Sequence, residues 1–267
     1  MRTWLTEEFG LSVPVVGAPM AGPGEGALAA AVSAAGGLGM VGVNASRSAE
    51  WVSRQAGIAG ADGHRFGIGL MAWALESNPE QLAATLASGA SVVSVSFGDF
   101  EPHVRTLKDA GMTVTTQAGN LAEALAAERC SVDFLVVRGA VGAWVGTAFL
   151  GCREAGNSSE ARQRLFAATD TGTSYGAVFD VAQRLDWTGE YGGRALRNRY
   201  FDTWSDHLDQ LAQDQAAHDE LKTAREQGDY DTAYLYAGQG VGLLESERSV
   251  ADVLDEFAAA EELLKRF

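Results

Sequence analysis

The chain has 267 residues, of which 46% are hydrophobic, so it is long enough to bury one sizeable core. Its 35 acidic and 20 basic residues give a net charge of -15, which would repel nucleic acid and anionic lipid. The length therefore predicts one domain. The charge predicts a small-molecule substrate, with neither nucleic acid nor a membrane as partner.

Two cysteines, Cys130 and Cys152, are too few for a disulfide framework, and neither lies in a Cys-x-x-Cys or Cys/His metal-binding pattern. We therefore expect free thiols in a reducing cytoplasm and no metal site. The N-terminus meets Glu7 and Glu8 too soon for a signal peptide, and no apolar run is long enough to span a membrane. These features predict a cytoplasmic protein.

The first half of the chain alternates β-rich apolar runs with alanine-rich helical stretches, which is typical of βα units around a parallel sheet. The expected strands are Val13–Ala18, Gly39–Val43, Arg65–Leu70, Ser91–Phe97, Thr113–Gln117 and Val132–Val137. The expected helices are Gly26–Ala35, Ala49–Gly57, Pro79–Ser88, Glu101–Ala110 and Leu121–Arg129. Several of these helices end at a glycine. The spacing predicts an α/β fold, a TIM-type (β/α) barrel.

The second half differs from the first. After the apolar run Val141–Leu150, the chain is expected to be mainly helical, with amphipathic stretches at Thr203–Gln227 and Val250–Phe267. No change of composition marks a second domain. We therefore expect residues 1–267 to form a single domain, with residues 151–267 as its mainly helical C-terminal part.

One junction conflicts with a complete barrel. Val132–Val137 and Val141–Phe149 both have the composition of buried strands, yet only Arg138, Gly139 and Ala140 separate them. Neighbouring parallel strands need a crossover of roughly a dozen residues or more. The two runs are therefore a hairpin, one long bent strand, or two barrel strands that have lost the βα unit between them. Each alternative predicts an incomplete or distorted barrel.

Two turns have the composition of ligand-binding segments. The first expected strand, Val13–Ala18, leads through Pro19 and Met20 into a glycine-rich turn, and strand C-termini form the active-site face of a barrel. An ordinary βα loop would have the same composition. At Gly146 and Thr147, backbone N–H groups and a hydroxyl suit a phosphate dianion, although a strand that merely ends at glycine gives the same pattern.

Taken together, these segments resemble the nitronate monooxygenase (2-nitropropane dioxygenase) family of FMN-dependent TIM barrels. Ala18-Pro19-Met20 and the segment Ala30–Gly39 are similar to the opening of that family. Further similarities follow in the family's order, at Phe66–Leu70, Val93–Gly98, Thr115–Ala118, Trp144–Leu150, Val178–Gln183, Gly193–Asn198 and Tyr236–Gly242. The resemblance implies a flavoprotein oxidoreductase that oxidises alkyl nitronates with dioxygen.

The resemblance also implies which residues contact the cofactor. In the family the first loop lies against the flavin ring, and a Gly-Thr turn holds the FMN phosphate. The expected FMN-binding residues are Ala18, Pro19, Met20, Gly69, Gln117, Arg138, Trp144, Val145, Gly146, Thr147 and Gln239. Arg138 stands near the family's flavin-contacting glutamine, so it either attracts phosphate or joins the acidic surface. Gln239 either contacts flavin or substrate, or belongs to a packing turn.

Two parts of the family pattern are missing. The family has an asparagine near Gly69 that helps to hold FMN. It also has a Gln-Gly-x-Glu-Ala-Gly-Gly-His segment, followed by a helix, a seventh strand and another helix, whereas this chain runs from Arg138 directly into its last strand. Because the histidine of that segment is the family's catalytic base or orienting group, no catalytic residue is assigned. The chain's own histidines lie outside the matching motifs and are expected to face solvent: His64, His103, His207 and His218.

Three functions remain open. Nitronate oxidation, weakened by the missing segment, is the first, because a nitronate already has carbanion character and needs orientation more than a strong base. The second is a non-catalytic or degenerate flavin-binding scaffold, since a fold does not establish an activity. The third is an FMN-dependent enoyl reductase, which a preference for NAD(P)H over nitronate would distinguish.

Overall fold

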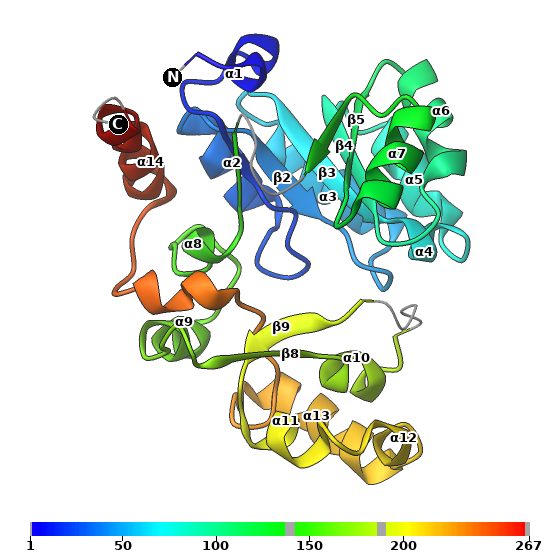
Figure 1. Ribbon diagram of the computed structural model, residues 1–267, viewed down its shortest axis with the longest axis vertical. Coiled ribbons are helices and arrows are strands. Elements are labelled where there is room, and N and C mark those ends of the chain that lie inside the picture. Colours follow the sequence, from blue (N-terminus) through cyan, green and yellow to red (C-terminus); the bar gives the residue numbers. More distant parts are fainter. Residues whose placement is uncertain (1, 137–141, 186–190, 265–267) are drawn as a thin grey trace. The chain divides into compact units, whose positions relative to one another are not determined.

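The computed structural model describes residues 2–136, 142–185 and 191–264. The chain divides into two compact units, which Figure 1 shows coloured along the sequence. Unit 1 comprises Met1–Gly156 and Arg248–Phe267, and unit 2 comprises Asn157–Glu247. That residues 1–267 act as one domain stays a prediction, and the two units are described separately below.

Unit 1 contains an open ring of parallel strands. They are β1 (Val15–Gly17), β2 (Gly39–Gly42), β3 (Phe66–Met71), β4 (Val92–Ser96), β5 (Thr113–Gln117), β6 (Phe134–Val136) and β7 (Ala143–Val145). β2 to β6 form one sheet in chain order, and β7 pairs with β1. A parallel bridge from Val16 to Leu38 joins β1 to the chain just before β2. The strand order is therefore β7-β1-β2-β3-β4-β5-β6, an incomplete TIM-type barrel, which confirms the predicted fold class.

The helices of unit 1 follow the strands. They are α1 (Trp4–Phe9), α2 (Gly26–Ala34), α3 (Ala49–Ala59), α4 (Ala72–Leu75), α5 (Pro79–Leu86), α6 (Glu101–Asp109), α7 (Leu121–Arg129), α8 (Thr147–Leu150) and α14 (Val250–Leu264). Local signals fix several starts: Ser48 and Asn120 accept backbone N–H bonds as N-caps of α3 and α7, and α5 begins at Pro79. The sequence did not predict α1 or α4.

The outer face of the sheet packs against helices that include α3, α5 and α6 (Figure 1). Alternate strand residues, including Ile68, Val93 and Val114, are fully buried in a cluster that contains side chains of α3, α5 and α6. Because side chains alternate across a strand, the residues between them face the interior of the barrel. One face of the sheet therefore packs against helices, and the other face lines the interior of the barrel.

The junction between β6 and β7 explains why the barrel is incomplete. β6 pairs with β5, β7 pairs with β1, and no bond joins β6 to β7 within the residues that the structure describes. Both strands run parallel to the rest of the ring, which excludes the antiparallel hairpin. The arrangement matches two barrel strands that have lost the βα unit between them. The connection itself, Arg138-Gly139-Ala140, lies outside the described residues.

The expected strand Val141–Phe149 is only partly correct. Its strand conformation ends at Val145, and Thr147 begins the short helix α8. Gly146 makes this change of direction, since its carbonyl accepts the N–H of Phe149 at 2.9 Å. Apolar composition alone does not distinguish a buried strand from a buried helical turn, and this run contains both.

Unit 2 combines a two-stranded antiparallel ladder with helices (Figure 1). Its elements are α9 (Ser159–Phe166), β8 (Thr173–Gly176), α10 (Val178–Ala182), β9 (Gly193–Leu196), α11 (Arg199–Trp204), α12 (Leu208–Leu211), α13 (Gln215–Gln227) and a 3₁₀ turn, η1 (Gln239–Leu243). Its core contains Phe179, Tyr200 and Leu221. The prediction for His218 was wrong: its ring is buried, and Nδ1 lies 2.7 Å from the Ala182 carbonyl oxygen. His218 thus packs α13 against α10.

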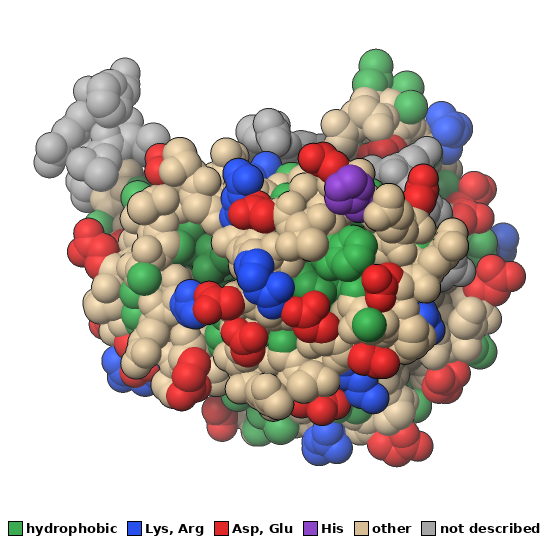
Figure 2. Space-filling view, turned by 90° about the horizontal axis from the view of Figure 1, so that it is seen from below, with side chains coloured by type: hydrophobic (Ala, Val, Ile, Leu, Met, Phe, Trp, Pro, Cys, Tyr) green, Lys and Arg blue, Asp and Glu red, His purple; other side chains and the backbone are tan. Residues whose placement is uncertain are grey.

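Two sequence expectations concern the whole chain. Cys130 and Cys152 are free thiols, as predicted. In the part of the chain that the structure describes, no helix is both long and apolar enough to cross a bilayer. Acidic and basic side chains are interspersed on the face shown in Figure 2, and ion pairs such as Arg199–Glu220 and Arg164–Asp231 neutralise some of them locally.

Candidate functional site

The C-terminal half of the barrel interior is built from small and polar residues. Across β2, β3, β4 and β5, the register aligns Gly42, Gly69, Ser94 and Thr115 in one row. These positions face the interior, because Val41, Ile68, Val93 and Val114, each one residue earlier on its strand, belong to the outer cluster. We call this row, together with Ser96 and Gln117 two residues further on, the polar layer.

The N-terminal half of the interior is apolar instead. Met40 and Val92 lie two residues before Gly42 and Ser94 on their strands, and they pack with Phe134 and with Leu5 and Phe9 of α1. The rings of Phe9 and Phe134 lie 6.2 Å apart. We call this group the apolar layer. Since α1 closes this end, ligand access to the interior is expected from the C-terminal ends of the strands, where barrel enzymes bind their substrates.

The loop after β1 lies directly over the glycines of the polar layer. A Cβ at Gly69 would lie 2.3 Å from Cβ of Pro19, and one at Gly42 would lie 2.5 Å from the backbone carbon of Met20. Backbone bonds hold the loop there, since Gly24 N donates to Met20 O and Gly42 N donates to Gly24 O, both at 2.9 Å. The structure thus brings together the predicted residues Pro19, Met20 and Gly69, and it requires glycine at position 69.

The end of β7 meets the same loop. Ala18 N donates to Val145 O at 2.7 Å, and a Cβ at Gly146 would lie 3.3 Å from Sδ of Met20. Thr147 is half-buried at the start of α8. Ala18, Met20, Gly146 and Thr147 are therefore neighbours, as the proposed cofactor contacts require.

Two of the predicted residues pack elsewhere in unit 1. The Trp144 side chain packs beside the apolar layer, and Val145 is buried in the cluster beneath α14. Arg138 lies outside the described residues, and Gln239 is an exposed residue of η1 in unit 2. Whether any of the predicted residues binds FMN stays a prediction.

The buried hydroxyls were missed by sequence reasoning. Ser94 and Ser96 are each 2% exposed and Thr115 is fully buried. Thr115 donates to the Phe134 carbonyl at 2.8 Å, and the Ser94 and Ser96 hydroxyls lie 3.3 Å apart. The signal was present, because β4 places serine at alternate positions of an otherwise all-valine strand. Such alternation predicts one polar face even where both faces are buried.

The histidines do not assemble a catalytic site at the polar layer. His64 and His207 are exposed, and His218 is buried in unit 2, where its ring contacts the Ala182 carbonyl. His103 is half-buried on α6, where desolvation lowers its pKa and the nearby Asp99 opposes that shift. Among the described residues, no group of His, Cys, Asp or Glu has the arrangement of a metal site.

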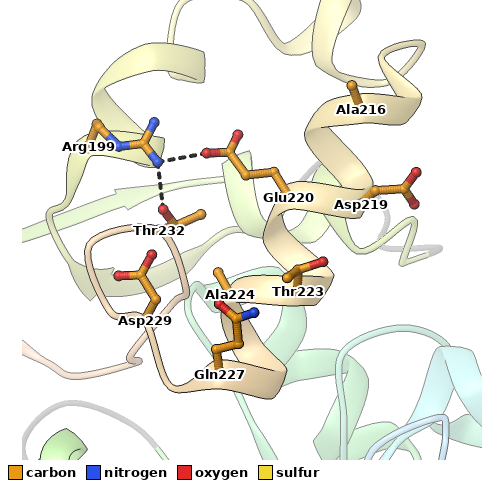
Figure 3. Close-up of a pocket in the computed structure, with 9 residues that line it drawn as sticks. All are labelled: Arg199, Ala216, Asp219, Glu220, Thr223, Ala224, Gln227, Asp229 and Thr232. Atoms are coloured by element: carbon orange, nitrogen blue, oxygen red, sulfur yellow. Dashed lines mark hydrogen bonds and ion pairs between the residues drawn. The ribbon is translucent and has the colours of Figure 1, made fainter.

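Two surface cavities are lined by other residues. One, of about 330 Å³, is lined by Gly60, His64 and Ser88 among others. The other, of about 350 Å³, lies in unit 2 beside α13 (Figure 3). There the Arg199 guanidinium spans the side chains of Glu220 and Thr232, with Nη2 2.7 Å from an oxygen of each. Neither cavity contains a predicted cofactor residue.

Comparison with known proteins tests the resemblance. No protein-family model matches the chain. A nitronate monooxygenase of Neurospora crassa is 28% identical to it over 190 residues. Among solved structures, FabK from Thermotoga maritima has a TM-score of 0.81 at 19% identity, covering 99% of both chains. Nitroalkane oxidase from Streptomyces ansochromogenes has a TM-score of 0.80 at 21% identity, covering 98% of this chain and 99% of the other.

The predicted resemblance to the nitronate monooxygenase family is confirmed. The structural similarities establish the fold over nearly the whole chain. The nitronate monooxygenase from N. crassa and the Streptomyces nitroalkane oxidase are oxidising enzymes by name, which agrees with the predicted class of flavin oxidoreductase. The match covers 68% of this chain but only 46% of the N. crassa nitronate monooxygenase, so the chain spans about half the length of that relative.

Proposed function

We propose that this chain is an FMN-dependent oxidoreductase that oxidises alkyl nitronates with dioxygen. The observation that carries the proposal is the polar layer beneath the Ala18–Met20 loop, at the strand ends where barrel enzymes bind their ligands. Its occurrence in a chain that resembles nitronate monooxygenases supports flavin as the ligand and a nitronate-like small molecule and dioxygen as reactants.

The chemistry of the residues fits FMN. Glycines at positions 42 and 69 let the loop with Pro19 and Met20 lie close to the strands, and the hydroxyls and the Gln117 amide provide both hydrogen-bond donors and acceptors. The Gly146–Thr147 turn offers backbone N–H groups and a hydroxyl suited to a phosphate. When bound, FMN supplies an electron-accepting ring that dioxygen can reoxidise.

The protein's own contribution is orientation. A nitronate enters as an anion with carbanion character, so the chain needs to hold it against the ring and does not have to remove a proton from carbon. The residues of the polar layer include no histidine, which agrees with a role in orientation and not in proton removal. The expected consequence is that preformed nitronates react, whereas neutral nitroalkanes, which require deprotonation first, react far more slowly.

The cofactor is tested by the absorption spectrum of the purified full chain, followed by chromatography of the chromophore released on heating. The proposal expects a flavin spectrum and released FMN. Colourless protein that also fails to quench the fluorescence of added FMN would overturn it. An FMN complex without turnover would favour the alternative of a non-catalytic scaffold.

The activity is tested by oxygen consumption with the nitronate anion of 2-nitropropane and with propionate 3-nitronate. We expect oxidation slower than that of a full-length relative, since the family's histidine and seventh strand have no counterpart here. The enoyl reductase alternative draws on the structural similarity to FabK. It predicts the reverse preference, with rapid anaerobic bleaching of the flavin by NADH or NADPH and none by nitronate.

The proposed location is the cytoplasm. Its support is that Cys130 and Cys152 are both free thiols, which suits a reducing compartment. Fractionation of the source cells, with an antibody against the chain, would test the location directly.

A further inference from the structure

The sheet of unit 1 splits at its C-terminal edge between β4 and β5. β4 stays paired with β3 as far as Met71 and Ser96, and β5 stays paired with β6 as far as Gln117 and Val136. The ladder between β4 and β5, however, ends at Ser94. The two strands thus separate at the face where open parallel sheets and barrels bind ligands.

A side-chain oxygen replaces the missing rung of this ladder. Thr113 N donates to the carbonyl of Ser91, so a continued ladder would pair Gln117 N with the carbonyl of Val95, two steps later. Instead, Gln117 N donates to Oγ of Ser96 at 3.1 Å. Ser96 is 2% exposed, so a lost acceptor there would leave the Gln117 N–H poorly solvated.

Neighbouring hydroxyls fix the orientation of Ser96. Its Oγ lies 3.3 Å from Oγ of Ser94 and 3.4 Å from Oγ1 of Thr116, and all three residues are buried. Ser96 therefore sits in a small hydroxyl network that spans the split. A residue held in this way has little freedom to turn away from the backbone that it supports.

The side chain supported by this arrangement is that of Gln117. It is half-buried, it projects from the same face as Thr115, and its amide makes no hydrogen bond within the described part of the chain. A primary amide carries a donor and an acceptor side by side. That pattern is complementary to a cyclic imide, where a ring N–H lies between two carbonyls, and the pyrimidine edge of flavin is such an imide.

We propose that Gln117 binds the imide edge of the flavin and that Ser96 is a positioning residue that aims Gln117 at it. The proposal rests on the proposed function, because it requires that flavin binds at the polar layer. It adds an orientation for the flavin ring, whose imide edge would lie at the split between β4 and β5.

The experiment compares two flavins in a binding titration of FMN-depleted full-length protein. FMN offers the imide N–H, whereas 3-methyl-FMN carries a methyl group in its place. For the wild-type protein we expect FMN to bind about tenfold more tightly, the size expected for one good hydrogen bond. In Gln117→Ala the two flavins should bind equally, and in Ser96→Ala their ratio should fall most of the way to one.

The matched control is Thr85→Val, which removes a buried hydroxyl from α5, outside the polar layer, and leaves Ser94, Ser96 and the bond to Gln117 N in place. Its ratio of affinities should stay near the wild-type value. If Ser96→Ala fails to fold, as judged by circular dichroism, Ser96→Cys keeps the volume with a much weaker acceptor. It should show the same reduced ratio.

The outcomes separate the two proposals. An unchanged ratio in Gln117→Ala would overturn the assignment of the imide edge while leaving FMN binding intact. A wild-type ratio in a folded Ser96 variant, together with a lost ratio in Gln117→Ala, would overturn the positioning role of Ser96. Failure of the wild-type protein to bind either flavin would overturn the proposed function, and this inference with it.

Discussion

The interior of the barrel has two layers of opposite character. The apolar layer packs Met40, Val92 and Phe134 against α1, while the polar layer, which follows Met40 and Val92 on β2 and β4, carries glycines and hydroxyls. Burial of apolar area stabilises the first, whereas buried hydroxyls add little net stability even when bonded. The N-terminal end of the barrel therefore stabilises the fold, and the C-terminal end is available to bind a ligand.

The largest expected effect comes from breaking the apolar layer. Phe9 is 5% exposed and its ring packs against Trp4 and Phe134. Phe9→Ala should lower the free energy of unfolding by about 3–5 kcal/mol, as for other large-to-small core changes. Urea denaturation followed by circular dichroism measures this loss. The FMN affinity of the molecules that remain folded should be unchanged, and a loss below about 1 kcal/mol would contradict the separation of the layers.

A smaller effect is expected where the loop meets the polar layer. Gly69→Ala places a Cβ against the Pro19 ring and should destabilise the protein by about 1–3 kcal/mol through overpacking. FMN binding should weaken at the same time, because the loop is displaced. Gly57→Ala on α3 is the matched control, since its Cβ would meet nothing within 4 Å. That helix substitution should raise stability by up to about 1 kcal/mol without affecting FMN.

Substitution of Thr147 is expected to weaken FMN binding with little change in stability. Thr147→Val keeps the volume of the side chain and removes its hydroxyl, so FMN affinity should fall roughly fivefold to tenfold. Riboflavin, which lacks the phosphate, should bind the variant and the wild-type protein equally. Fluorescence titration with both ligands checks this. An equal loss for riboflavin would show that Thr147 does not contact the phosphate.

The smallest expected effect is a loss of stability at alkaline pH that depends on Cys152. This residue lies in the core outside both layers. Burial, reinforced by Glu154, raises the pKa of its thiol to about 12. When folding raises the pKa of an acid, the unfolded state loses its proton at a lower pH than the folded state. The free energy of unfolding therefore falls as the pH rises from the pKa of the unfolded state to that of the folded state. Unfolding free energy should therefore decline from about pH 9 upward. Cys152→Ala should flatten this decline, and a wild-type slope in that variant would contradict the assignment.

Much of unit 1 was predictable because its signals are local and repeated. Thr113–Gln117 and Leu121–Arg129 have the predicted bounds, and the other predicted strands and helices up to β5 agree within a few residues. Valine-rich runs, helix caps and terminal glycines mark those elements independently of tertiary context. The short junction after Val132–Val137 likewise predicted an incomplete ring from the geometry of crossovers alone.

The elements that were missed depend on tertiary contacts or are very short. α1 has six residues, and its only signals are Thr3 as N-cap and Gly10 in the left-handed conformation after its end. β8 has no apolar alternation and forms by pairing with β9 across the intervening α10. Of the candidate site, the sequence predicted the loop and the Gly146–Thr147 turn, but the split between β4 and β5 is a property of register that no single segment contains.

The return of α14 to unit 1 has a consequence for the order in which the protein is assembled during synthesis. Val250, Val253 and Leu254 pack in one cluster with Leu28 and Phe149, although all of unit 2 lies between Phe149 and α14 in the sequence. A ribosome therefore releases every strand of the ring before it has made the helix that completes this cluster. Unit 2, whose residues are contiguous, can collapse first. A nascent chain stalled before Val250 should thus show protease protection in residues 157–247 before the cluster beneath α14 is protected.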